Sequence, residues 1–373
     1  QRWTGLPRIS FYGLVGFALA STQLGVLPAP DAGPVALLAD IAFGLILFEL
    51  GYRFNLRWLR HNPWIGVAGL VESLLTFVLV YLVALAFGSS QLVALMMAAL
   101  SMGTSPATIV RVINEYRSSG QVTERVLHLT ALNCVLAVFA FNAIIGFWIF
   151  RTFDAVGEAL WQSTVGLAGS LLIGGVFGVV VPALLRTIHN PRQDATVAFA
   201  LAIVLLVAIC DAGTLSPYIA ALSFGLTARH RRVAFSKAQR NFGPLGELLT
   251  VLLFLYAAST LDWRQIATGS ALAVIVVLVR QIAKTAGVMA FAHLSGVSWR
   301  KGALTGLGLA PLSVFVILLI EHARHAGVHV VEELRAMAAV TMLLEVFGPV
   351  IIQRALVWAR ESSAEAPEQN HAA

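Results

Sequence analysis

Charged residues are scarce in this 373-residue sequence: Asp, Glu, Lys and Arg together make up 12%, against 58% hydrophobic residues. Soluble domains carry about 25% charged residues, so this composition excludes an ordinary soluble protein. Cysteine is scarce as well. Cys134 and Cys210 lie in separate apolar runs, and their number and spacing exclude a disulfide framework, a zinc site and a CxxC redox pair. We expect neither a metal site nor a cofactor.

Long apolar runs are present along the whole chain. Runs of about 17 to 25 residues can cross the hydrocarbon layer of a bilayer as helices, and we predict twelve such spans. They cover residues 8–26, 34–51, 63–87, 91–116, 123–151, 157–187, 194–211, 214–229, 242–260, 262–292, 299–322 and 331–358. No soluble domain is left over, so the sequence predicts an all-α polytopic membrane protein.

The distribution of basic residues predicts the orientation of the chain. Nineteen Lys and Arg residues fall at the chain ends and in loops after even-numbered spans, and four fall on the other side. Basic residues near helix ends are retained in the cytoplasm, so both termini are expected there. The basic stretch Arg229–Arg240 is one short loop between two spans. We therefore interpret it as a topology signal and expect no nucleic acid partner.

Two further basic residues lie inside the tenth predicted span. Arg280 and Lys284 are four residues apart and share one helix face. A basic residue at membrane depth costs at least about 2.5–3.5 kcal/mol, so it usually faces a polar interior or serves a function. The alternatives are snorkelling toward the cytoplasm and a structural ion pair with a buried acid.

The fourth and eleventh spans each contain a break. Gly103-Thr104-Ser105-Pro106 interrupts the fourth, and Gly308-Leu309-Ala310-Pro311 interrupts the eleventh, because proline removes a donor and disfavours helix before it. Paired broken helices point to an inverted-repeat transporter with an ion site near the midplane. We predict a first repeat over 1–152 that lacks its first helix, a linker helix over 153–190, a second repeat over 191–360 and a disordered cytoplasmic tail over 361–373. A further helix is expected before Gln1.

Several short stretches in this order resemble the membrane domain of the cation/proton antiporter superfamily, on the thirteen-helix branch with sodium/proton and potassium-efflux antiporters. They are Leu47–Gly51 with Asn55-Leu56, Thr104–Pro106 with Val110–Val112 and Glu115, Thr130–Asn133, Leu215–Pro217 to Gly225-Leu226, Leu253-Phe254 to Leu261, Arg280 with Lys284, and Glu345 with Gly348-Pro349. The resemblance implies two crossed discontinuous helices and exchange of Na⁺ or K⁺ for protons. It also implies an elevator motion of spans three to five and ten to twelve, a homodimer, and a place in the bacterial inner membrane.

The resemblance also implies an ion site, with one departure. The family carries an Asn-Asp or Asp-Asp pair in the fifth helix, where this chain has Asn133-Cys134. The expected ion-site residues are Asn133, Cys134, Thr104, Ser105 and Lys284, supported by Arg280, Pro106, Pro311, Glu72 and Glu345. A thiol is soft and stays neutral when buried, so it replaces an aspartate poorly. We therefore expect Lys284 to lack its carboxylate partner and the chain to show little cation-driven proton flux.

Other interpretations remain open. Glu72 or Glu345 could take over the role of the aspartate, or either could form a structural salt bridge with Arg280 or Lys284. Cys134 could be a substitution that silences the site, or the chain could carry a different cargo, such as an anion or organic solute. It could also be a non-transporting sensor or scaffold. An intramembrane enzyme is not expected, because the sequence has no HExxH, no GxSxG and no pair of membrane aspartates.

Overall fold

The computed structural model describes residues 8–20, 23–26, 34–54, 56–150, 155–187, 191–213, 215–230, 243–259, 263–312, 316–317, 319–320 and 334–362. The helices in chain order are α1 (Arg8–Leu19), α2 (Pro34–Arg53), α3 (Leu56–His61), α4 (Pro63–Ala86), α5 (Gln91–Met102), α6 (Pro106–Glu115), α7 (Gln121–Phe150), α8 (Ala155–Thr187), α9 (Pro191–Ala212), α10 (Pro217–His230), α11 (Gly243–Ser259), α12 (Trp263–Ala290), α13 (Trp299–Gly308) and α15 (Arg335–Trp358). These ranges contain no strand, which confirms the all-α prediction.

Each predicted span overlaps at least one of these helices. Among the described residues, six helical stretches are long and apolar enough to cross a membrane. They are Pro63–Ala86, Gln91–Glu115, Gln121–Ile145, Thr164–Arg186, Ser270–Ala290 and Ala336–Trp358. The chain is thus a helical protein with several membrane spans, and the full number of twelve stays a prediction.

One helix was not predicted. The six-residue α3, with the sequence Leu-Arg-Trp-Leu-Arg-His, lies in the loop before α4. It is too short and too basic to register as an apolar run. It ends where Pro63 begins α4, a position at which proline costs nothing because the first amide of a helix has no partner within it.

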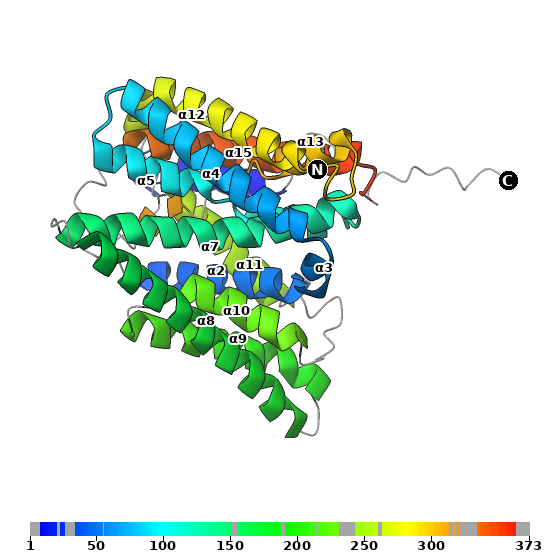
Figure 1. Ribbon diagram of the computed structural model, residues 1–373. Coiled ribbons are helices and arrows are strands. Elements are labelled where there is room, and N and C mark those ends of the chain that lie inside the picture. Colours follow the sequence, from blue (N-terminus) through cyan, green and yellow to red (C-terminus); the bar gives the residue numbers. More distant parts are fainter. Residues whose placement is uncertain are drawn as a thin grey trace.

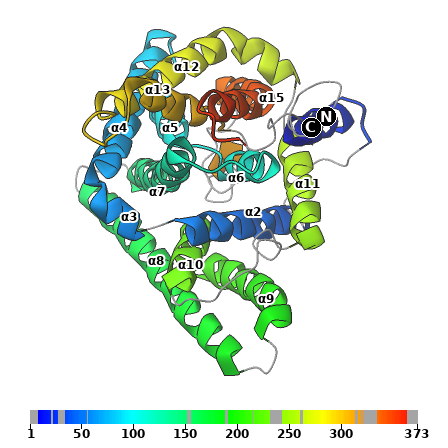
Figure 2. The ribbon, with the colours of Figure 1, turned by 90° about the vertical axis from the view of Figure 1, so that its right-hand side faces the viewer.

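The helices form two bundles that lie against each other (Figures 1 and 2). The first, here called the core bundle, contains α4, α5, α6, α7, α12, α13 and α15, with α12 packed on both α4 and α15. The second, here called the scaffold bundle, contains α1, α2, α8, α9, α10 and α11, with α10 packed between α2 and α8. The bundles meet where α7 lies against α8, where α6 lies against α2 and where α15 lies against α1.

Two glycines explain how tightly the scaffold bundle is packed. A Cβ on Gly51 would lie 2.1 Å from the carbonyl oxygen of Leu222, and one on Gly225 would lie 2.1 Å from that of Phe48. No larger residue fits either position without moving the backbone. Small residues at membrane helix crossings allow this close approach. Gly51 and Gly225, which both lie in stretches that resemble the antiporter superfamily, therefore serve the contact between α2 and α10.

Several loops predicted to be cytoplasmic lie at one end of the molecule. The amide of Ser119, in the α6–α7 turn, donates to the Glu361 carbonyl oxygen at 2.9 Å, and Lys301 at the start of α13 donates to Gln121 at 2.9 Å. The side chain of Glu361 also accepts the amides of Val122 and Thr123 at the start of α7. The first residue of the expected tail is therefore fixed, while residues 363–373 and 231–242 lie outside the described residues.

Candidate ion site

The two predicted breaks are present and they touch. Helix α5 ends at Met102 and α6 begins at Pro106, while α13 ends at Gly308 and is followed by irregular backbone. The amide of Ser105 donates to the carbonyl oxygen of Pro311 at 2.8 Å, so one break pairs with the other. Ser105 also caps α6 through its side chain, which accepts the amide of Thr108 at 3.4 Å. The predicted break in the fourth span is confirmed, and α13 ends at the predicted second break, while the crossing of two discontinuous helices stays a prediction.

Arg280 binds the carbonyl groups that these breaks leave without a helical partner. Its guanidinium donates to four carbonyl oxygens, those of Ser101 and Gly103 at the end of α5 and those of Leu309 and Ala310 after α13, at 2.7–3.3 Å. The side chain is fully buried. The last carbonyls of a helix carry partial negative charge, and Arg presents five donors in a fixed fork. Arg280 thus holds two helix ends together.

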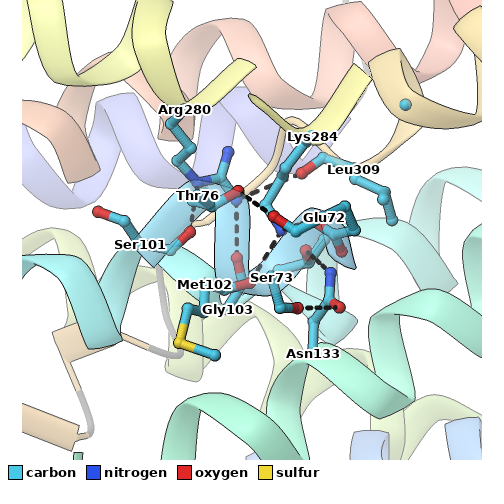
Figure 3. A network of polar contacts seen from close by, with 12 residues as sticks. Glu72, Ser73, Thr76, Ser101, Met102, Gly103, Asn133, Arg280, Lys284 and Leu309 are labelled. Carbon is cyan, nitrogen blue, oxygen red and sulfur yellow. Dashed lines mark hydrogen bonds and ion pairs between the residues drawn. The ribbon is translucent and has the colours of Figure 1, made fainter. Parts of the chain in front are cut away.

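Lys284 forms a buried ion pair with Glu72. Its Nζ lies 3.0 Å from Oε2 of Glu72 and 2.9 Å from the carbonyl oxygen of Met102, and both side chains have no exposed surface (Figure 3). The expectation that Lys284 lacks a carboxylate partner is therefore wrong: the partner comes from α4 instead of α7. The interpretation of Glu72 as a salt-bridge partner of Lys284 is confirmed.

The two carboxylate oxygens of Glu72 differ: Oε2 pairs with Lys284, while the Asn133 side chain is a further neighbour of the carboxylate. Oε1 is buried and has no hydrogen-bond partner within standard geometry among the described residues. Buried carboxylate oxygens in native structures nearly always have a partner, and an exception calls for a functional or structural explanation. The side chain sits close to α12 because Gly287 lets the two helices approach, with a Cβ there only 2.5 Å from the Cα of Glu72.

Asn133 lies next to this pair, on the other side of Ser73 from Lys284 (Figure 3), and Cys134 follows it in α7. Ser73 donates to Oδ1 of Asn133 at 3.1 Å, and Nδ2 of Asn133 donates to Oγ1 of Thr104 at 3.1 Å. The thiol of Cys134 donates to the Thr104 carbonyl oxygen at 3.5 Å. The three polar side chains are fully buried, so they fix one another in place.

The structure brings together all but one of the predicted site residues. Thr104, Ser105, Asn133, Cys134 and Lys284 lie around the two breaks, together with the supporting residues Arg280, Pro106, Pro311 and Glu72. Glu345 is different. It lies against α1, where a Cβ on Gly13 would be 2.7 Å from its Cγ, while Gly348 one turn later packs on Pro311.

Two contributors were missed by sequence reasoning. Ser73 is the polar neighbour of Glu72 in an apolar helix, which is a signal that could have been used. The carbonyl groups of Ser101, Met102 and Leu309 could not have been found, since every residue has a carbonyl and only the fold decides which ones are free of helical bonds.

The donor set suits a hard monovalent cation. Side-chain oxygens of Glu72, Ser73, Thr104 and Asn133 are collected in one buried volume, and hard cations take oxygen ligands. Within the described part of the chain, no group of three His, Cys, Asp or Glu side chains could hold a transition metal. Glu72 is the one carboxylate of this set, and Lys284 and Arg280 bring positive charge close to it.

A comparison with protein families decides the identity. Residues 1–358 match the family model described as "Sodium/hydrogen exchanger, transmembrane". The chain belongs to the sodium/hydrogen exchanger family. Membership makes it an integral membrane transporter and not an enzyme, and implies cations and protons as its substrates.

Solved structures support the same fold for this exchanger. The sodium proton antiporter MjNhaP1 from Methanocaldococcus jannaschii at pH 8 has a TM-score of 0.66 at 15% sequence identity, with 95% of this chain and 91% of that chain covered. An electron microscopy structure of the same antiporter gives a TM-score of 0.71 at 16% identity, with 95% and 90% covered. At this identity the likeness shows the fold alone. A search of curated proteins finds no match.

Proposed function

We propose that this exchanger transports a monovalent cation, Na⁺ or K⁺, against protons, and that Glu72 is its cation-binding carboxylate. The observation that carries the proposal is the buried Glu72–Lys284 pair, in which Oε1 of Glu72 makes no hydrogen bond of standard geometry within the described residues. The ion site then comprises Glu72, Asn133, Thr104, Ser73 and Lys284, while Arg280 holds the two breaks in position.

The charge of this site favours exchange of one cation for one proton. The ion pair is neutral overall, and a cation added to it would leave a net positive charge in a buried volume, at a cost of several kcal/mol. If Lys284 gives up its proton as the cation binds to Glu72, the net charge of the site, which also includes Arg280, does not change. Cation binding and protonation of Lys284 then exclude each other, which couples the two fluxes.

The Glu72–Lys284 pair changes the transport activity that we expect of a chain with Cys134. Low flux was expected because the fifth helix offers no carboxylate, but α4 supplies one beside the same two breaks. The thiol instead donates to the Thr104 carbonyl oxygen. In our proposal Cys134 supports the break and binds no cation, so the chain is active as it stands.

The anion alternative loses its basis. It rested on Lys284 and Arg280 as uncompensated charges, but Lys284 is paired with Glu72 and the Arg280 guanidinium already donates to four carbonyl oxygens. No specific observation favours an organic solute or a sensor.

An elevator motion of the core bundle against the scaffold bundle fits the packing. Both breaks and the ion pair belong to the core bundle, so the site can move as one unit. Near the end of α6, an elevator motion must break few contacts between the bundles, and these contacts are polar. One of them is the hydrogen bond that Asn114 donates to Glu49 of α2 at 2.9 Å. We propose further that the scaffold bundle forms a homodimer in a bacterial inner membrane, as the family resemblance implies.

Transport in proteoliposomes tests the proposal. An imposed Na⁺ or K⁺ gradient should drive proton movement through the unchanged protein, and Glu72→Gln should abolish it, because the amide cannot bind a cation with the same charge balance. Cys134→Ser should retain most of the flux. Glu124→Gln is the matched control, since its side chain is 50% exposed at the start of α7. Cation-driven flux that survives Glu72→Gln but not Cys134→Ser would refute the proposal.

A further inference from the structure

A second candidate site lies between the two bundles, and its wall contains none of the residues of the ion pair. It is a cavity of about 340 Å³ bounded by α3 and α4 on one side, α7 behind, and α8 and α10 on the other. Its wall includes Leu59, Leu70, Leu132, Leu171 and Leu226. Figure 2 shows α3 at the edge of the molecule between α4 and α8.

The chemistry of the wall excludes a polar ligand. Only two lining residues, His128 and Ser223, have polar side chains. Nδ1 of His128 lies 2.6 Å from the carbonyl oxygen of Glu124, and Ser223 donates to the carbonyl oxygen of Leu171 at 2.7 Å. An empty apolar volume of this size forfeits dispersion contacts along its whole wall. A wall of this composition suits a hydrocarbon chain.

The cavity opens toward the bilayer. Leu70 lines it and is 46% exposed, and it lies within the membrane-spanning part of α4. An acyl chain of a membrane lipid can reach the cavity from there without crossing water. A soluble apolar compound would first have to partition into the membrane.

A basic cluster lies on α3, the helix that contributes Leu59 to the cavity wall. Helix α3 exposes Arg57, Arg60 and His61. Trp64, at the first turn of α4, is 41% exposed, as is typical of residues at the membrane–water interface. Arg57 and Arg60 are three residues apart and share one helix face, where they can bind a phosphate group with several donors.

We infer that this cavity binds an anionic phospholipid, with one acyl chain between the bundles and the headgroup phosphate on Arg57 and Arg60. The lipid would contact α4 and α7 of the core bundle and α8 and α10 of the scaffold bundle at once. It would therefore act as a spacer between the two parts. The inference concerns binding alone and does not depend on the proposed function.

Lipid binding to the purified full chain tests the headgroup contact. Native mass spectrometry should show tighter binding of phosphatidylglycerol than of phosphatidylcholine with the same chains. Arg57→Gln with Arg60→Gln should weaken phosphatidylglycerol binding about fivefold for each arginine, since a basic residue near the surface contributes about that factor. Arg354→Gln, an exposed arginine on α15, is the control and should change nothing. Equal binding of the two lipids, or no effect of the double variant, would overturn the headgroup contact.

Two measurements test where the chain goes. Leu132→Trp should fill the cavity and reduce binding of both lipids, while Leu74→Trp, at a position 59% exposed on α4, should not. If Leu132→Trp does not fold, the unchanged protein can be photocrosslinked with a phosphatidylglycerol that carries a photoreactive acyl chain. Its adducts should map to α4, α7 and α10 at the cavity wall. Adducts confined to other helices would refute the site.

Discussion

At the scale of single residues, the candidate site is built around the ion pair of Glu72 and Lys284, which lie 212 positions apart in the sequence. Removing one partner of a buried pair leaves an uncompensated charge and typically costs about 3–5 kcal/mol. Separating Glu72 from Lys284 therefore costs free energy, which favours the conformation in which the two side chains are in contact. Gly287 is part of this arrangement, because its missing Cβ allows α12 to approach Glu72.

Gly287→Ala should separate α12 from α4 and weaken both stability and transport. The new Cβ would lie 2.5 Å from the Cα of Glu72, which is backbone and cannot move alone. Overpacking of this kind costs about 1–3 kcal/mol. Thermal unfolding in detergent and flux in proteoliposomes check the prediction.

Gly166→Ala is the matched control for that change. A Cβ at Gly166 of α8 meets nothing within 4 Å, so the substitution should be neutral or gain up to about 1 kcal/mol from helix propensity. Equal behaviour of the two variants would contradict the close α4–α12 packing.

Sequence reasoning found the charged residues of the site but not their pairing. Glu72, Arg280 and Lys284 stand out because a charge in an apolar run is costly, and that cost is visible in the sequence. Which acid meets which base depends on how α4 and α12 cross, and nothing local to either helix specifies it. For the same reason, the aspartate missing at Cys134 was taken to leave Lys284 without a partner.

At the scale of helices, the two breaks were predictable and the contacts between the bundles were not. Pro106 and Pro311 mark the breaks because proline acts locally. The contact of α6 with α2 is made by Asn114, which donates to Glu49 and accepts from Arg53, and Arg53 also pairs with Glu49 at 2.8 Å. These residues lie in two helices far apart in the sequence, and each alone is typical of a helix end.

Asn114→Ala should loosen the boundary between the bundles. The substitution removes the hydrogen bonds that join α6 to α2, so amide hydrogen exchange should accelerate in α6 and in the last turn of α2. Gln281→Ala also loses two amide hydrogen bonds, to Thr285 and the Gly306 carbonyl oxygen, but both lie inside the core bundle. Faster exchange in α6 with Gln281→Ala, or none with Asn114→Ala, would show that this contact does not hold the bundles together.

At the scale of the whole molecule, the orientation in the membrane is a prediction from charge counting, and several of the counted loops lie together at one end. The α6–α7 turn, the start of α13 and the end of α15 are joined there by hydrogen bonds of Ser119 and Lys301. Single cysteines at Ser236 and Ser363, which lie outside the described residues, should resist an impermeant thiol reagent added outside intact cells.

A cysteine at Gln91 is the positive control for this orientation. Gln91 is exposed at the start of α5, on the side opposite to the basic loops, and should label readily from outside. The two native cysteines are buried and should give little background. Labelling at Ser236 and Ser363 with protection at Gln91 would reverse the orientation.

Proton release on cation binding tests the central claim most directly. Addition of Na⁺ or K⁺ to the purified protein in weakly buffered detergent solution should release about one proton per bound cation, since Lys284 gives up its proton as Glu72 takes the cation. Cys134→Ser should behave like the unchanged protein, and Glu72→Gln should release none. Saturable proton release that persists in Glu72→Gln would contradict the account and place the cation site elsewhere.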